Sequence, residues 1–204
     1  MKILLIDPPM QSIMLARADW YPMSLSYLAG SAIAEGHDVL IYNGEHDKDL
    51  DYVNLTTYSK NYHLYPEALN NADHYAWKKY KKVLTQYKPD IIGVTAFSVK
   101  FPSALRIAAI SKDYNPSLPV IMGGQHTTIM TDQVLSDRNI DFAVRANTRR
   151  KSSDGGKKSY PIYSTGDRGK VLYQFDFKYS DTDESLIDMA YFNKSIKLDT
   201  KRMN

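Results

Sequence analysis

The chain has 204 residues, of which 43% are hydrophobic and 24% are charged, enough for one domain with a buried core and a smaller addition. The absence of cysteine excludes a disulfide framework, a thiolate nucleophile, cysteine-ligated zinc and an iron–sulfur cluster in this chain. Residues 1–145 hold 14 Lys and Arg against 15 Asp and Glu, whereas residues 146–204 hold 12 against 8. No apolar run is long enough for a membrane helix, and the start becomes polar too early for a signal peptide, so we expect a cytoplasmic protein.

Short apolar runs alternate with helical periodicity from the first residues onward. Lys2–Asp7 and Asp38–Tyr42 are predicted strands, and Tyr21–Glu35 between them has the spacing of a helix. The stretch that follows is too long for a simple crossover between strands. We expect Pro66–Tyr87 to form the second helix, preceded by an insertion at about residues 45–65.

This long stretch is rich in aromatic residues. They either line a ligand pocket or pack against the sheet or a partner surface, and the sequence leaves both interpretations open. The residues are Tyr52, Tyr58, Tyr62, Tyr65, Tyr75, Trp77, Tyr80 and Tyr87.

Three more apolar runs complete the pattern of the first 145 residues. Ile91–Ala96, Leu118–Met122 and Ile140–Val144 are predicted strands, with helices at Pro102–Asp113 and Thr128–Asp137. Strands that are apolar throughout and separated by helices are typical of a parallel sheet covered on both faces. The sequence therefore predicts an α/β, flavodoxin-like, doubly wound sheet of five parallel strands in the order 2-1-3-4-5.

The composition changes after residue 145, and residues 146–204 form a predicted extension. Its start, 147–159, is polar, basic and glycine-containing, which is typical of a solvated linker; nucleic-acid binding is the less favoured interpretation. Tyr160–Tyr163 and Lys170–Tyr179 are predicted to pair as a hairpin, and Glu184–Ile196 is a candidate short helix. The role of this extension is not apparent from its sequence.

The most distinctive local feature is a pair of glycines directly after the fourth predicted strand. Gly123 and Gly124 lack a Cβ, so a large ligand could press against the backbone there; the alternative is a plain tight turn. Gln125, His126 and Thr127 follow and add hydrogen-bonding groups at a helix start. A single histidine after a turn is more often structural than a metal ligand.

Two other loops are expected at the same edge of the sheet. Thr95 and Ser98 follow the third strand with two hydroxyls, and Pro8, Pro9 and Met10 follow the first strand in a rigid loop. Because parallel strands end at one edge, the three loops form a platform there, which is the predicted ligand site.

Several familiar motifs are absent. Neither glycine-rich nucleotide motif occurs. Asp47, Asp49 and Asp51 mimic the start of a calcium loop, but Tyr52 and Tyr58 occupy the positions that require glycine and glutamate. No metal-ligand set and no Ser–His–Asp constellation can be argued from the spacing, so no catalytic residue is predicted.

Six sequence blocks, in order, carry a family resemblance. The first 145 residues resemble the cobalamin-binding domain at the N-terminus of many B12-dependent radical S-adenosylmethionine enzymes. The matching blocks are Lys2–Pro9, Tyr21–Ala29, Glu35–Val39, Lys88–Thr95, Pro119–Thr127 and Ile140–Val144.

The resemblance implies cobalamin at the carboxyl edge of the sheet. Gly123 and Gly124 would then lie against the nucleotide tail, Thr95 and Ser98 would hydrogen-bond in the same groove, and Pro8–Met10 would border the corrin. In methionine-synthase-like relatives a histidine after the first strand ligates cobalt. This loop has no histidine, so we expect cobalt without a protein histidine ligand.

The chain also departs from the family. The Gly-Glu-Gly-Glu element expected after the fifth strand is replaced by Arg145-Ala146-Asn147-Thr148, and the catalytic domain with its cysteine motif is missing. The resemblance thus implies a cobalamin-binding module that is not catalytic alone and serves a radical S-adenosylmethionine methyltransferase or cyclase, as domain or subunit. The alternatives are a degenerate domain that binds no cofactor and acts through protein contacts, and a flavin or nucleotide binder on the same fold.

Overall fold

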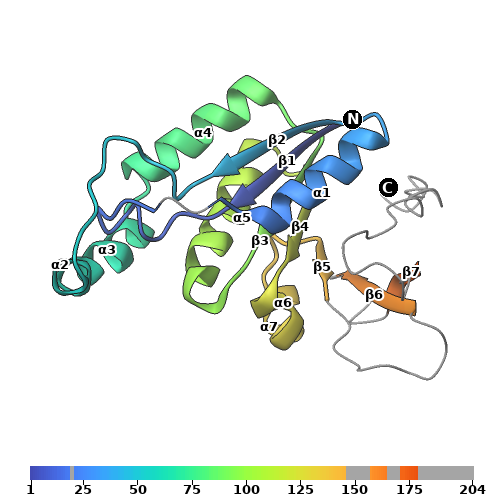
Figure 1. Ribbon diagram of the computed structural model, residues 1–204. Helices are drawn as coiled ribbons and strands as arrows, with labels where there is room; N and C mark the ends of the chain where they lie inside the picture. Colours follow the sequence, from blue (N-terminus) through green and yellow to red (C-terminus); the bar gives the residue numbers. More distant parts are fainter. Residues whose placement is uncertain (19–20, 146–156, 165–170, 179–204) are drawn as a thin grey trace.

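The computed structural model describes residues 1–18, 21–145, 157–164 and 171–178, and its strands form one sheet (Figure 1). The strand order is β2-β1-β3-β4-β5-β6-β7, with β1 to β5 pairing in parallel. The predicted flavodoxin-like fold with order 2-1-3-4-5 is therefore confirmed. The strands are β1 (Lys2–Asp7), β2 (Asp38–Asn43), β3 (Ile91–Thr95), β4 (Val120–Gly123), β5 (Phe142–Val144), β6 (Lys157–Ser164) and β7 (Val171–Lys178).

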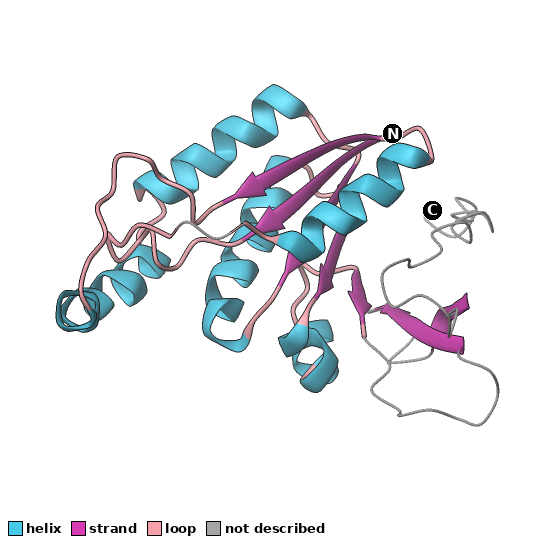
Figure 2. Ribbon diagram, in the orientation of Figure 1, coloured by secondary structure: helices cyan, strands magenta, loops and turns pink. Residues whose placement is uncertain are grey.

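Helices cover both faces of the parallel part of the sheet (Figure 2). Because side chains alternate along a strand, Leu4 and Ile6 of β1 enter the main core, whereas Leu5 packs on the other face with Leu25 and Ala29 of α1. The main core lies between the sheet and the two helices α4 and α5. The helices concerned are α1 (Met23–Ala34), α4 (Tyr75–Tyr87) and α5 (Phe101–Tyr114).

The region between β2 and α4 contains three further short helices: α2 (Leu55–Lys60), the 3-10 turn η1 (Asn61–His63) and α3 (Leu64–Asn70). The prediction of one helix over Pro66–Tyr87 was wrong, since the chain breaks between α3 and α4. Asn71 accepts a hydrogen bond from the backbone N–H of Asp73 at 2.9 Å, an Asx turn that competes with helical hydrogen bonding. His74 then begins α4 as its N-cap.

Most of the aromatic residues of this region pack in or against the hydrophobic core. Trp77 and Tyr80 are completely buried and Tyr65 nearly so, whereas Tyr52 and Tyr62 are exposed. The buried hydroxyl and indole groups are satisfied: Trp77 Nε1 donates to Ala68 O at 2.8 Å, and the Tyr80 hydroxyl meets Ser111 Oγ at 2.7 Å. Packing against the sheet is thus the better interpretation of these buried aromatics.

The helix predicted over Thr128–Asp137 is two helices instead, α6 (Gln125–Ile129) and α7 (Thr131–Leu135). They meet at Met130, whose φ of −121° and ψ of 44° lie outside the helical range. Thr131 Oγ1 donates to Thr127 O at 2.7 Å across the break, which gives the end of α6 a side-chain partner.

The predicted hairpin of the tail is present. β6 pairs antiparallel with β5 and with β7, so the hairpin continues the sheet beyond its parallel part. The predicted linker 147–159 was wrong at its end, because Lys157–Ser159 belong to β6 and pair with β7. Residues 147–156 and the candidate helix Glu184–Ile196 lie outside the described residues, and a division of the chain after residue 145 stays a prediction. Among the described helices none is both long and apolar enough to cross a membrane.

Candidate functional site

The carboxyl ends of β1, β3 and β4 lie side by side, so their following loops share one edge of the sheet. Backbone hydrogen bonds join two of these loops directly. Ala96 N donates to Gly123 O at 2.8 Å, and His126 N donates to Ala96 O at 3.0 Å. The structure thus brings the predicted residues after β3 and after β4 into one unit.

Glycine occurs for different reasons at the end of β4, where Gly123 is the last residue of the strand and Gly124 follows it. Gly124 has a φ of 104°, and a Cβ there would lie 2.7 Å from Ala96 O and 2.9 Å from Ala96 N. Gly124 is therefore required by the turn itself. A Cβ on Gly123 would meet only Val144 Cβ, at 3.8 Å, which is an ordinary contact. The protein's own packing does not require glycine at 123, and the open space beside it is compatible with a ligand lying close to the backbone.

His126 is the second residue of α6 and is 7% exposed. Its Nδ1 lies 3.1 Å from Ser98 Oγ, and its ring lies 4.0 Å from that of Phe101, centroid to centroid. Ser98 is the first residue of the 3-10 turn η2 (Ser98–Lys100) and is itself exposed. The loops after β3 and β4 are thus also connected through side chains.

The remaining predicted residues of this edge are placed unevenly. Gln125 is exposed on α6, and Thr95 is nearly buried at the end of β3. Thr127 is completely buried and donates its hydroxyl to Gly123 O at 3.2 Å, so it supports the turn from inside.

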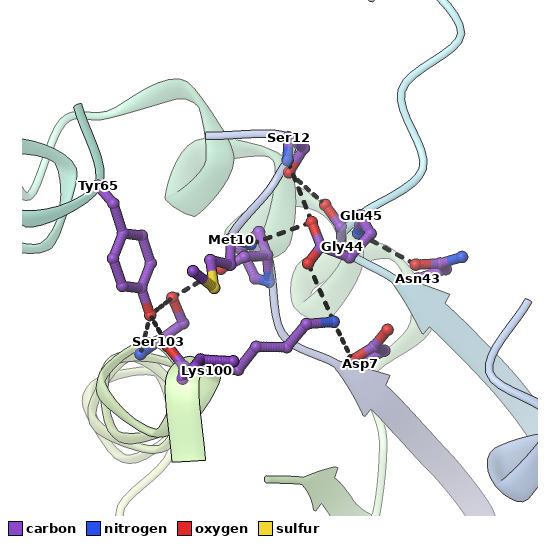
Figure 3. Close-up of polar contacts among 11 residues, drawn as sticks. Asp7, Met10, Ser12, Asn43, Gly44, Glu45, Tyr65, Lys100 and Ser103 are labelled. Atoms are coloured by element: carbon purple, nitrogen blue, oxygen red, sulfur yellow. Dashed lines mark hydrogen bonds and ion pairs between the residues drawn. The ribbon is translucent and has the colours of Figure 1, made fainter. Parts of the chain in front are cut away.

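The loop after β1 is fixed by buried residues and hydrogen bonds. Pro8 and Pro9 are buried and Met10 is half-buried. Ser103 of α5 donates its hydroxyl to Pro9 O at 2.6 Å and also lies 2.9 Å from the Tyr65 hydroxyl (Figure 3). Burial of Tyr65 raises the pKa of its hydroxyl, which keeps that group neutral and able to donate.

Sequence reasoning missed a buried ionic cluster beneath this loop (Figure 3). Lys100 Nζ lies 2.8 Å from Asp7 Oδ1 and 3.0 Å from Glu45 Oε1, and the three side chains are at most 6% exposed. Burial raises the pKa of Asp7, and the nearby Lys100 ammonium only partly opposes that shift. The one available signal was Asp7 itself, an acidic residue at the end of an apolar strand.

Glu45 also binds the loop after β1. Its Oε2 accepts the backbone N–H groups of Met10 and Ser12, each at 3.1 Å. Gly44, just before it, approaches so closely that a Cβ would lie 2.8 Å from Asp7 O and from Pro9 N. The ends of β1, β2 and β3 are therefore connected through two carboxyl groups, those of Asp7 and Glu45, and the ammonium group of Lys100.

Large apolar side chains are exposed around the same edge. Phe97 and Val99 follow β3 and are 42% and 63% exposed, and Ile129 and Met130 lie at the α6–α7 junction at 74% and 45%. Exposed apolar side chains that form a contiguous surface are typical of a binding site. These side chains would suit the face of a broad, mostly apolar ligand.

Two shallow pockets flank this edge. One, of about 190 Å³, is lined mainly by Ile13, Leu15, Leu64 and His74, and none of the aromatic residues discussed above lines it. The other, of about 290 Å³, lies between α6, α7 and Arg145. Within the described part of the chain no group of three His, Asp or Glu side chains could hold a metal ion.

The fold and this edge define a doubly wound α/β domain of the kind that holds ligands at the carboxyl ends of its strands. Residues 68–150 match the family model described as the B12 binding domain. This part of the chain is thus similar to a B12-binding domain, and the resemblance seen in its sequence is confirmed.

Two curated proteins are similar to this chain. Over 148 residues it is 30% identical to an uncharacterized methyltransferase, PH0819, of Pyrococcus horikoshii, a match covering 71% of this chain and 26% of that protein. Over 128 residues it is 29% identical to the anaerobic magnesium-protoporphyrin IX monomethyl ester cyclase of Rubrivivax gelatinosus, covering 62% of this chain and 19% of that protein. The matches thus span about a fifth to a quarter of these relatives.

Among solved structures, the C-terminal domain of the coenzyme A biosynthesis bifunctional protein CoaBC is similar with a TM-score of 0.44 and 11% identity. The alignment covers 86% of this chain and 88% of that one.

Proposed function

We propose that this chain is a cobalamin-binding module that serves a radical S-adenosylmethionine methyltransferase or cyclase. The observation that carries the proposal is the B12-binding family match, which includes the ends of β3 and β4 and their loops. The cofactor would supply methyl-transfer or radical chemistry at its cobalt, and the protein would hold and orient it.

The site residues fit a corrinoid in three respects. A Cβ at Gly123 would make only one ordinary contact, with Val144, so the fold itself does not demand glycine there. His126 Nε2 is a buried polar atom without a partner among the described residues. The exposed side chains of Phe97, Val99 and Ile129 offer apolar surface to a macrocycle.

In this proposal the nucleotide tail lies against Gly123 and Gly124, near Thr95 and Ser98. The macrocycle lies over the apolar edge beside Pro8–Met10. That loop contains no histidine, and its backbone is fixed by Glu45 and Ser103. Cobalt would therefore be bound without a protein histidine ligand.

The partner would be a radical S-adenosylmethionine catalytic domain, either in the same polypeptide or as a separate subunit. The short match to the curated relatives supports this, since about three quarters or more of each relative lies outside it. The chain alone would bind the cofactor without turning over a substrate.

The test is reconstitution with hydroxocobalamin. The purified protein is incubated with an excess of the cofactor and desalted, and its absorbance is recorded. A retained corrin spectrum at about one equivalent supports the proposal. A colourless protein contradicts it. Gly123→Leu is the matched variant, since a large side chain would occupy the space proposed for the ligand, and it should lose the colour while keeping its circular dichroism.

One observation favours a second candidate, a domain that acts through protein contacts without a cofactor. Helix α1 carries no charged residue, and Tyr27, Leu28 and Ile33 on it are each at least half exposed. An exposed apolar helix face is typical of a protein interface. Retention of a corrinoid would show that contacts through α1 are not the whole function.

A further inference from the structure

One side chain at the site has a polar atom that the fold leaves without a partner. His126 is 7% exposed, and its Nε2 atom is buried with no hydrogen bond from any described residue. An unpaired buried polar group costs free energy, so its presence calls for an explanation.

The rest of His126 is fully engaged, so the ring cannot turn to satisfy Nε2. Its Nδ1 is 3.1 Å from Ser98 Oγ, and its backbone N–H is bound to Ala96 O at 3.0 Å. The ring also packs on Phe101, with centroids 4.0 Å apart and planes inclined by 31°. A flip of the ring would exchange one unpaired nitrogen for the other.

We propose that Nε2 of His126 donates a hydrogen bond to an acceptor oxygen in the nucleotide tail of the corrinoid, and that Ser98 sets the tautomer required. This inference rests on the proposed function and specifies one contact within it. A Ser98 hydroxyl that donates to Nδ1 leaves the ring proton on Nε2. Phosphate and ribose oxygens of the tail are suitable acceptors.

The surroundings of His126 favour the tail over the macrocycle. Gly123 and Gly124 come directly before α6, and neither adds a side chain between the backbone and a narrow ligand group. Thr127, the next hydroxyl on α6, is already bound to Gly123 O. Of the two buried side chains on this helix, His126 is thus the one whose hydrogen-bonding capacity remains for a ligand.

The test compares two corrinoids, cobalamin and cobinamide, which lacks the nucleotide tail. Dissociation constants are measured for the wild type, His126→Phe, His126→Gln and Ser98→Ala. His126→Phe should bind cobalamin roughly tenfold more weakly, as expected for loss of one buried hydrogen bond, and should bind cobinamide as the wild type does. His126→Gln should recover most of the loss, because its amide can donate from a similar position.

The stability of the ligand-free protein separates this role from a structural one. His126→Phe keeps a ring against Phe101 and removes the unpaired nitrogen, so its melting temperature should not fall. A histidine with only a structural role would instead give a lower melting temperature and equal losses for both corrinoids.

The outcomes also separate this inference from the proposed function. If the wild type binds both corrinoids and His126→Phe binds cobalamin equally well, the inference is overturned while the proposed function stands. Equal weakening toward both corrinoids overturns it as well. If the wild type binds neither corrinoid, the proposed function fails, and the assignment of His126 fails with it.

Discussion

Lys100 and Asp7 lie 93 positions apart in the sequence, yet Nζ of Lys100 is 2.8 Å from Oδ1 of Asp7 in the interior of the protein. The same ammonium group lies 3.0 Å from Glu45 Oε1. Because Asp7 ends β1, Glu45 follows β2 and Lys100 follows β3, this cluster fixes the chain at three neighbouring strand ends. The proposed cofactor edge is thus supported from beneath by charge pairs rather than by apolar packing alone.

Replacement of Lys100 by Met should destabilise the protein strongly. Two buried carboxylates would lose their shared cation, and breaking a buried ion pair costs about 3–5 kcal/mol. For a chain of this size that corresponds to a fall in melting temperature of roughly 10 °C, measurable by differential scanning fluorimetry. Lys82→Met, on the exposed face of α4, is the matched control and should stay within about 0.5 kcal/mol of the wild type. Equal behaviour of the two variants would show that the cluster contributes nothing to stability.

The raised pKa of Asp7 predicts a pH dependence of stability. The native state holds a proton on Asp7 at pH values where the unfolded chain has lost it. The contribution of Asp7 to the free energy of unfolding is therefore largest below the ordinary pKa of 3.8. The contribution declines as pH rises from 3.8 toward the raised native pKa. The free energy of unfolding of the wild type minus that of Asp7→Asn should therefore decrease with pH upward from about 4. Urea unfolding at a series of pH values measures this difference in the free energy of unfolding. A difference that increases with pH would contradict a raised pKa of Asp7.

The two glycines at the end of β4, Gly123 and Gly124, should respond differently to replacement by alanine. Gly124→Ala forces a side chain into a φ of 104° and toward Ala96 O, which should cost about 1–3 kcal/mol or more. Gly123→Ala adds one ordinary contact with Val144, so its stability should change by about 0.5 kcal/mol or less. Chemical denaturation measures both changes. A Gly123 variant as unstable as the Gly124 variant would mean that both glycines serve the turn.

Ser103→Ala should loosen the loop after β1. Pro9 O would lose its donor at 2.6 Å and the Tyr65 hydroxyl would lose a neighbour at 2.9 Å, both in the interior. An unsatisfied buried group costs about 1–3 kcal/mol. Tyr65→Phe, which keeps the Ser103–Pro9 bond, should cost less, and the double variant should show coupling in urea unfolding. Strictly additive effects would show that the two hydroxyls act independently.

The strand order and the glycine turn could be predicted from the sequence because both depend on local signals. Apolar runs mark parallel strands, and Gly124 marks a backbone conformation that other residues avoid. The breaks within the two predicted helices were missed because each depends on the local hydrogen bonding or backbone conformation of a few residues. An Asx turn at Asn71 ends the helical run before α4. The backbone of Met130 leaves the helical range, although neither proline nor glycine marks this position in the sequence.

The ionic cluster could not be predicted, because nothing in the sequence pairs one lysine with two acidic residues. Glu45 looked like part of a polar insertion, although it is completely buried. Lys100 lies in a short turn that usually faces solvent. Their burial depends on three loops meeting in space, and that meeting follows from strand order rather than from sequence spacing.

The pairing of β6 with β5 has a practical consequence for shortened versions of the protein. β5 has three residues and β6 has eight. A chain ending at Arg145 would leave only a very short open edge, which is a poor template for another molecule. A chain ending after Ser164 would instead present one long unpaired strand to its neighbours, and edge-to-edge aggregation would follow. The choice of end point on either side of this strand therefore decides how readily the protein stays dispersed in solution.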